Sequence, residues 1–309
     1  MNIDLRELEI FCAVVERASF TKAAEQVHLA QASVSERIAK LERSVGAPLL
    51  HRSTRDVTPT AVGRRLYDGA KGLLAEHRSM VNNLADLVGL RSGELAIGAS
   101  TIPGEYLLPG QLAAYRAAFP DIRVRMIISG SRESANRVAL GEFEVGVISS
   151  GIAHDDLEAT PIWRDELVVV APAGHRWRGR TEVSLEQLAG EPIVLREPGS
   201  GTRSAFEAAI ADRRPGGVDF LNIAAELGST TAVKEAVLDG LGVGVVSTKA
   251  LAPEMENKSV MLVRLAGIDM GRSINSVVHR RRALSPAARS FVEHLHDADR
   301  TRSEQPNTR

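Results

Sequence analysis

The N-terminal part of the chain has apolar residues at helical spacing. They recur three or four positions apart, at Leu5, Leu8, Cys12 and Val15. This spacing predicts an amphipathic helix, because residues so separated share one helix face. Ser19 is a typical capping residue, and a second helix is expected over residues 21–27. A third helix is expected over residues 31–45, ending at Gly46. Its apolar stripe consists of Val34, Ile38 and Leu41.

A short basic segment and a long helix follow. Residues 48–57 predict a β-hairpin, and Thr58-Pro59 has the pattern of a helix start, a cap followed by proline. The helix is expected over 60–90. Its apolar positions alternate spacings of four and three, at Leu66, Ala70, Leu73, His77, Met80, Leu84 and Leu87, widened by Tyr67, Leu74, Val81 and Val88. This heptad pattern predicts a dimer seam. The alternative is a helix that packs on its own domain.

After a boundary at residues 91–93, short apolar strands alternate with helices. The strands are expected at 95–98, 124–128, 145–148, 167–170, 193–195 and 243–246. The helices are expected near 109–118, 131–141, 203–212 and 229–239. This alternation predicts an α/β region with a mostly parallel sheet. Its length favours two subdomains, and the polar tail after His296 is expected to be disordered.

Composition is typical of a globular protein of more than one domain. Of the 309 residues, 44% are apolar and 25% are charged, and no apolar run is long enough for a membrane span. The N-terminal residues carry charges and lack a cleavable apolar segment, so we expect a cytoplasmic protein. Cys12 is the single cysteine, which excludes a disulfide framework and a cysteine metal cluster.

The net charge of −1 is unevenly distributed along the chain. Between Gln31 and Arg65 there are 7 Lys and Arg residues against 3 Asp and Glu residues. A local positive patch of this kind suits contact with DNA phosphates, and a solvated basic face is the simpler alternative.

The third predicted helix has the properties of a DNA recognition helix. Small residues at Ala23 and Ala24 allow the second helix to approach it closely. A recognition helix presents its N-terminal residues to base edges, where Gln can contact adenine and Ser can bond to several bases. The predicted hairpin would contribute contacts to phosphate or to the minor groove. The candidate DNA-binding residues are Gln31, Ala32, Ser33, Ser35, Glu36, Arg37, Lys40, Arg52 and Arg55.

Four segments closely resemble the LysR-type transcriptional regulators. They are residues 19–25 (SFTKAAE), 33–42 (SVSERIAKLE), 49–52 (LLHR) and 58–63 (TPTAVG). The chain departs from the family at Ala30-Gln31-Ala32, where Ser-Gln-Pro is common, and this weakens the helix cap. It also has Glu36 where Arg or Gln is frequent, so the operator sequence does not follow from the resemblance.

The resemblance covers the whole chain and implies an α/β protein with an all-α N-terminus. It implies a winged helix-turn-helix over residues 1–59, a dimerising linker helix over 60–91 and an effector domain over 92–296 that resembles periplasmic binding proteins. The effector domain would have two subdomains, 93–163 with 267–296 and 164–266, and residues 297–309 would form a disordered tail. It also implies double-stranded operator DNA and a small effector as partners, in a homodimer or homotetramer. RNA polymerase is a further candidate partner.

Three Ser/Thr/Gly loops are candidates for the effector site. Each lies at a strand end or helix start, where free N–H groups can hold an anion. On sequence alone, such loops are most simply caps and turns, and only the implied family fold brings them together. The candidate effector-binding residues are Ser100, Thr101, Ile102, Ser149, Ser150, Ser200, Gly201, Thr202 and Arg203.

Neutral hydroxyls with one arginine favour a small compact anion such as sulfate or sulfite. Residues 98–109 (GASTIPGEYLLP) and 226–231 (ELGSTT) resemble the family subgroup linked to sulfur assimilation and sulfite sensing.

Two alternative functions, a solute-binding protein and an enzyme, would use the same three loops as a binding site. A solute-binding protein would need a signal peptide and would not need the first 90 residues, and an enzyme would need a base beside its nucleophile. No His lies within the three loops. We therefore expect a regulator without enzymatic activity, cofactor, metal or membrane contact.

Overall fold

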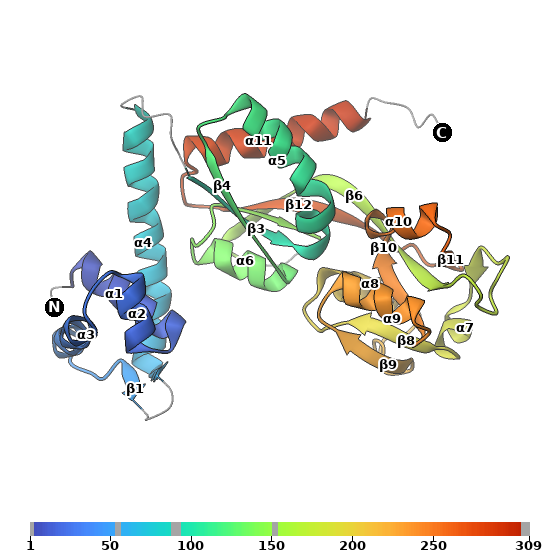
Figure 1. Ribbon diagram of the computed structural model, residues 1–309, viewed down its shortest axis with the longest axis horizontal. Helices are drawn as coiled ribbons and strands as arrows, with labels where there is room; N and C mark the ends of the chain where they lie inside the picture. Colours follow the sequence, from blue (N-terminus) through green and yellow to red (C-terminus); the bar gives the residue numbers. More distant parts are fainter. Residues whose placement is uncertain (1–2, 53–56, 88–93, 150–153, 304–309) are drawn as a thin grey trace. The chain divides into compact units, whose positions relative to one another are not determined.

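The computed structural model describes residues 3–52, 57–87, 94–149 and 154–303 of the chain. The chain divides into two compact units, one formed by residues 1–88 and the other by almost all of the remaining chain. Figure 1 shows the elements of each unit. Among the described residues, no helix has the length and apolar character needed to cross a bilayer.

The N-terminal unit is a helix-turn-helix with a two-stranded wing. Its elements are α1 (Leu5–Arg17), α2 (Phe20–Gln26), α3 (Gln31–Val45), β1 (Leu50–Arg52), β2 (Val57–Pro59) and α4 (Ala61–Leu87). Ser19 caps α2 by accepting a hydrogen bond from the Lys22 N–H, and Gly46 ends α3 in the left-handed conformation with φ 79°. Ala23 and Ala24 are buried in the core with Val34 and Leu41, as close packing of α2 on α3 requires.

The start of α4 differs from the sequence prediction. Thr58 and Pro59 belong to β2, where Pro59 is opposite Leu50 in the antiparallel pair. The cap is Thr60, whose Oγ1 accepts a hydrogen bond from the Gly63 N–H at 3.0 Å. Pairing with β1 keeps residues 57–59 extended, so the helix begins later than the Thr-Pro pattern indicates.

The first half of α4 packs on its own domain, as in the alternative to a dimer seam. Ala70 and Leu74 are buried against Leu8 and Cys12 of α1, with Leu66 and Tyr67 packed beside them. Leu66 and Ala70 are both positions of the predicted dimer seam. Three further apolar side chains of that seam are exposed within the described chain, namely Leu73 (49%), Met80 (54%) and Val81 (46%).

The C-terminal unit is built on a mixed sheet whose order is β4-β3-β5-β12-β6-β10-β8-β9. Its strands are β3 (Glu94–Ser100), β4 (Arg123–Ser129), β5 (Val145–Ile148), β6 (Leu157–Pro172), β7 (Glu182–Val183), β8 (Pro192–Arg196), β9 (Asn222–Leu227), β10 (Val243–Ser247), β11 (Val260–Leu265) and β12 (Gly271–His279). Strands β3, β4 and β5 pair in parallel, as do β8, β9 and β10. The mostly parallel prediction holds for these two groups, whereas β6, β11 and β12 add antiparallel pairs.

Strand β6 joins the two halves of the sheet. Its residues 157–166 pair with β12, and its residues 167–172 pair with β10 and β11. The sequence pattern predicts only the second part, because residues 157–166 (LEATPIWRDE) lack a continuous apolar run.

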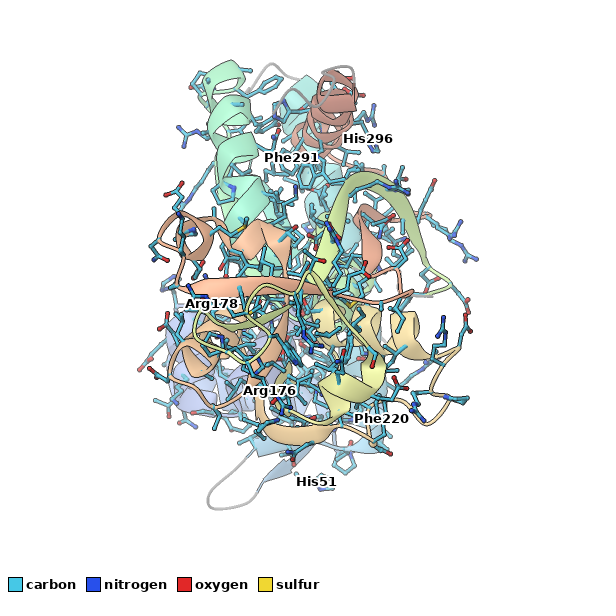
Figure 2. All side chains as sticks on the ribbon, turned by 90° about the vertical axis from the view of Figure 1, so that its right-hand side faces the viewer. His51, Arg176, Arg178, Phe220, Phe291 and His296 are labelled. Carbon is cyan, nitrogen blue, oxygen red and sulfur yellow. The ribbon has the colours of Figure 1, made fainter. Side chains whose placement is uncertain are left out.

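Helices cover both faces of the sheet. They are α5 (Leu108–Ala118), α6 (Ser131–Ala139), α7 (Leu185–Ala189), α8 (Gly201–Ile210), α9 (Thr230–Leu238), α10 (Ala252–Glu256) and α11 (Pro286–Ser303), with the short turns η1 (Pro103–Leu107) and η2 (Thr248–Ala250). Phe291 of α11 is fully buried and lies edge-on to Tyr115 of α5 with ring centroids 5.1 Å apart (Figure 2).

The end of the chain differs in part from the expected disordered tail. Residues 297–303 continue α11, because extending an existing helix avoids the cost of nucleation. The remainder of the expected tail, residues 304–309, lies outside the described residues.

Candidate functional site

Helix α3 presents the polar face that the sequence predicts. Val34, Ile38 and Leu41 are fully buried, so the opposite side faces outward. Gln31, Ala32, Glu36 and Lys40 are exposed, and Ser33, Ser35 and Arg37 are half-buried. The N-cap residue Ala30 makes no side-chain hydrogen bond. The first N–H groups of α3 therefore lack a side-chain cap, at the end where a recognition helix meets DNA.

Lys40 has a partner within the domain. Its Nζ lies 2.6 Å from Oε1 of Glu7, a carboxylate that is only 2% exposed. The Glu7 carboxylate of α1 partly neutralises the charge of Lys40, although 63% of the lysine side chain remains exposed. Lys40 thus couples the orientation of α3 to α1.

The wing is tied to α3 by a carboxylate. Oε1 of Glu42 accepts hydrogen bonds from the N–H groups of Leu49 (2.9 Å) and Leu50 (3.4 Å). Arg52 lies at the end of β1, and His51 beside it is exposed (Figure 2). Arg55 is outside the described residues.

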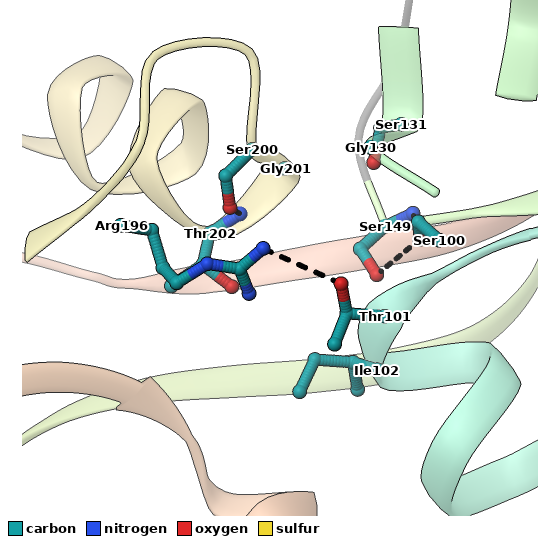
Figure 3. Close-up of a pocket in the computed structure, with 10 residues that line it drawn as sticks. All are labelled: Ser100, Thr101, Ile102, Gly130, Ser131, Ser149, Arg196, Ser200, Gly201 and Thr202. Carbon is teal, nitrogen blue, oxygen red and sulfur yellow. Dashed lines mark hydrogen bonds between the residues drawn. The ribbon is translucent and has the colours of Figure 1, made fainter. Parts of the chain in front are cut away.

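In the C-terminal unit, loops from distant parts of the sequence meet at one small pocket (Figure 3). The empty space in the pocket and at its open mouth is about 200 Å³. The lining residues are Ser100, Thr101, Ile102, Gly130, Ser131, Ser149, Arg196, Ser200, Gly201 and Thr202. The structure therefore brings together seven of the nine candidate effector residues. Ser150 is outside the described residues, and Arg203 does not line the pocket.

Three helical segments begin at the pocket. Helical backbone starts at Thr101, at Ser131 of α6 and at Gly201 of α8. A Cβ atom added to Gly201 would lie 2.5 Å from Ser131 Oγ, so the starts of α6 and α8 approach each other closely. Helix N-termini offer free N–H groups and a partial positive charge, which attract anions.

The Ser131 hydroxyl is an unsatisfied polar group of this pocket. Ser131 is 1% exposed, and its Oγ has no hydrogen-bond partner among the described residues. A buried hydroxyl without a partner is unfavourable unless a ligand or a water molecule forms a hydrogen bond with it. Its position between the two helix starts fits a bound group that accepts a hydrogen bond.

The guanidinium in the pocket belongs to Arg196, which sequence reasoning missed. Arg196 is 3% exposed, and it donates to both carboxylate oxygens of Glu197 (2.7 and 2.9 Å). It also donates to Thr230 Oγ1 at 2.8 Å and to Thr101 Oγ1 at 3.4 Å. One signal was available, since Arg196 directly follows the predicted strand 193–195 and ligands gather at the carboxyl ends of parallel strands.

Arg203, the predicted cation of the site, is directed away from the pocket. Its Nε donates to Glu207 at 2.5 Å, and its Nη1 donates to Glu226 at 2.9 Å. Glu207 lies one turn further along α8 and Glu226 lies on β9, and these carboxylates hold the guanidinium on the outer side of the helix start.

A second arginine, Arg272 of β12, contacts the lining residue Thr202. It lies opposite Asp165 in the pairing of β12 with β6, and its Nε donates to Asp165 Oδ2 at 2.8 Å. Its Nη1 donates to Thr202 Oγ1 at 3.3 Å, and Ser247 donates to the other oxygen of Asp165 at 2.6 Å. Burial lowers the pKa of Arg272, whereas Asp165 raises it and the charge of Arg196 lowers it again.

Protein-family comparison matches almost the whole chain. Residues 5–64 match the bacterial regulatory helix-turn-helix protein, lysR family, and residues 89–300 match the LysR substrate binding domain. The HTH-type transcriptional activator CmpR of Synechocystis is 29% identical over 95% of both chains. The RuBisCO operon transcriptional regulator of Allochromatium vinosum is 33% identical over 95% of both. CysL of Bacillus subtilis, an HTH-type transcriptional regulator, is 32% identical over 87% of this chain and 89% of its own.

Solved structures have the same fold. Full-length OxyR from Pseudomonas aeruginosa covers the whole of both chains with a TM-score of 0.72 and 21% identity. CbnR, solved with its target DNA, covers 96% of this chain and all of its own with a TM-score of 0.67 and 22% identity. The regulatory domain of CcmR from Synechocystis, solved with 2-PG, covers 67% of this chain and 98% of its own, with a TM-score of 0.61 and 23% identity.

Proposed function

The chain belongs to the LysR family of DNA-binding transcriptional regulators, whose members are not enzymes, and we propose that a small oxyanion in the Ser/Thr/Arg pocket controls its binding to operator DNA. The observation that carries the proposal is the buried, unsatisfied Ser131 hydroxyl between two helix starts. The proposal places the protein in the cytoplasm, as a homodimer or homotetramer, with RNA polymerase as a further partner.

The exposed face of α3 supports base contact. Gln31 and Ser33 lie in the first turn, where a recognition helix approaches base edges, and Ala30 leaves the helix start without a side-chain cap. CbnR, which has the same fold, was solved with target DNA. We therefore assign Gln31 and Ser33 to base readout, and assign Arg37 and Arg52 to phosphate contact.

Replacing Gln31 and Ser33 with alanine should weaken binding to the cognate operator by about tenfold or more, because a good base contact contributes about 1–3 kcal/mol of discrimination. Binding to unrelated DNA of equal length should be unchanged. Fluorescence anisotropy at fixed salt measures both affinities. An equal loss on the two DNAs would remove these residues from base readout.

The chemistry of the pocket supports a compact anion. Its lining supplies six Ser or Thr hydroxyls with one guanidinium, and it has no aromatic side chain among the described lining residues. Sulfate, sulfite and thiosulfate are compact anions that match this polar lining. CcmR holds 2-PG in a domain of the same fold.

A thermal-shift screen of the full-length protein with sulfate, sulfite, thiosulfate, selenite, phosphate and small carboxylates tests the effector. At least one oxyanion should raise the melting temperature, because a ligand that binds only the folded state stabilises it. Gly201→Ala should abolish the shift, since its Cβ would enter the pocket 2.5 Å from Ser131 Oγ. Gly110→Ala is the control, because a Cβ there meets nothing within 4 Å. An unchanged shift in Gly201→Ala would place the anion elsewhere.

A further inference from the structure

Glu7 of α1 is a buried carboxylate that lies against α3. Its side chain is 2% exposed, and its Oε1 lies 2.6 Å from Nζ of Lys40. The neighbouring cation on α1, Arg6, is directed elsewhere. It donates to Glu9 Oε2 at 2.8 Å and to the Val27 carbonyl at 2.9 Å. A carboxylate removed from water is strongly unfavourable unless an opposite charge lies beside it, so Glu7 requires the Lys40 ammonium to stay close.

Lys40 lies on the same face of α3 as Ser33. Seven positions separate the two residues, which is about two turns and about 10 Å along the helix axis. The lysine side chain is 63% exposed, so no surrounding structure shields it from a bound duplex. By position alone, Lys40 would be assigned to a DNA phosphate beyond the bases that the start of α3 reads.

The ion pair with Glu7 argues against that assignment. If the ammonium moved to a phosphate, the buried carboxylate would lose its compensating charge, which disfavours the move. If the ammonium stayed, an approaching phosphate would meet a neutral pair. Contacts to phosphate strengthen DNA binding because net positive charge releases counterions from the duplex. In both cases Lys40 adds little to the salt-dependent part of DNA binding.

The same pair connects α3 to the rest of the N-terminal unit through α1. Leu8, the residue after Glu7, packs with Cys12 against Ala70 and Leu74 of α4. Apolar contacts thus hold α1 on α4, and the charge of Glu7 holds α3 on α1. The ion pair lies two turns beyond Ser33, where it restrains rotation of α3 and so orients the end that meets the bases.

We propose that Lys40 is a positioning residue of the DNA-binding unit, which orients α3 through Glu7 and is not a phosphate contact. The inference rests on the proposed function, because it takes Gln31 and Ser33 of α3 as the residues that read bases. It separates two properties that a phosphate-binding lysine would join. Loss of the pair should lower the preference for the operator without lowering the number of phosphate contacts.

The variant that tests this separation is Glu7→Gln combined with Lys40→Met in the full-length protein. Removing Lys40 alone would leave a buried carboxylate without its partner, which endangers folding, whereas removing both charges avoids this. Fluorescence anisotropy with operator and with unrelated DNA, between about 50 and 200 mM potassium chloride, gives the slope of log affinity against log salt concentration. This slope should equal that of the wild type. The ratio of operator to unrelated affinity should fall about threefold or more, because base contacts depend on the orientation of α3.

Glu7→Gln alone is an independent test, because it keeps the shape of the side chain and frees the Lys40 ammonium. The salt slope should become steeper by about 0.9, the value for one added phosphate contact, and binding to unrelated DNA should strengthen. Glu9→Gln is the matched control, because Glu9 is an exposed carboxylate of the same helix that pairs with Arg6. It should change neither the slope nor the operator preference. Arg52→Met, at a proposed phosphate contact, should flatten the slope by about 0.9.

A slope flattened by about one contact in the double variant would make Lys40 a phosphate contact and overturn the inference. An unchanged operator preference in the double variant, or an unchanged slope in Glu7→Gln, would also overturn it. These outcomes leave the proposed function intact. A wild-type protein that binds operator and unrelated DNA equally would instead overturn base readout by α3, and the inference with it.

Discussion

At the scale of single residues, neighbours in the fold decide which of two similar side chains serves the site. Arg196 and Arg203 are both buried arginines near the Pro-Gly-Ser-Gly loop. Arg203 is held outside the pocket by Glu207 and Glu226, whereas Arg196 extends into it from the end of β8. The nearby sequence favours Arg203, because it lies in the predicted loop and helix start. The carboxylate of Glu226 reaches Arg203 only through pairing of β8 with β9, a strand that the sequence pattern does not predict.

At Gly63, the backbone leaves no room for the Cβ atom of any other residue. A Cβ atom there would lie 2.0 Å from the backbone oxygen of Leu49, which is fully buried and also accepts a hydrogen bond from the Thr60 N–H. Backbone cannot move away as a flexible side chain can. The glycine is therefore required where the start of α4 packs against Leu49, the residue directly before β1.

Gly63→Ala should destabilise the N-terminal unit by about 1–3 kcal/mol, the usual cost of overpacking. Thermal or urea unfolding followed by circular dichroism measures the change. Gly69→Ala on the same helix is the control, because a Cβ at that position would meet nothing within 4 Å and alanine favours a helix by about 0.5–1 kcal/mol over glycine. Equal stability of the Gly63→Ala protein and the wild type would contradict the packing argument.

At the scale of elements, α3 and α4 each serve two purposes. Helix α3 buries one stripe and leaves its other face outward, and its start at Ala30 has no side-chain cap. Helix α4 packs its first half on α1, while Leu73, Met80 and Val81 remain exposed. Exposed apolar residues at heptad spacing on a helix favour association with a second copy of that helix. Some apolar residues of the heptad pattern therefore pack within the domain, and the exposed ones are available for the proposed dimer contact.

Ala30→Ser should stabilise α3 by about 0.5–2 kcal/mol, because a serine oxygen can accept a hydrogen bond from an N–H of the first turn. The backbone at Ala30 already has the extended geometry of a capping residue, with φ −69° and ψ 144°. Thermal unfolding checks the gain. Ala32→Ser, which places the same hydroxyl at an exposed position inside the helix, should give no gain. If both variants behave alike, capping is not what limits the start of α3.

At the scale of the whole molecule, the pocket and α3 lie in different units of one chain. If an anion in the pocket changes the affinity for operator DNA by some factor, DNA must change the affinity for the anion by the same factor. The required link is a difference in how each ligand binds the alternative states of the protein. Strand β6, with Asp165 next to the change of sheet partners, connects the two halves of the C-terminal unit.

Sulfate affinity measured with and without saturating operator DNA should therefore differ, typically by about 5–150-fold, with the same factor for operator affinity with and without sulfate. Calorimetry and fluorescence anisotropy give the two factors. Potassium chloride at matched ionic strength controls for the salt dependence of DNA binding. Two unequal factors, or two factors of one, would contradict control of DNA binding by the pocket.

The sequence by itself determined the helix-turn-helix, the wing, the long helix and the alternating α/β region, because these depend on local periodicity, caps and turn residues. It identified the three hydroxyl loops for the same reason. Only the tertiary structure decided which of their residues meet, because parallel pairing brings strand ends together across long sequence separations. Thus Ser131 and Arg196 joined the pocket and Arg203 did not. Arg272, distant in sequence, reached Thr202 because β12 pairs with β6 beside the pocket.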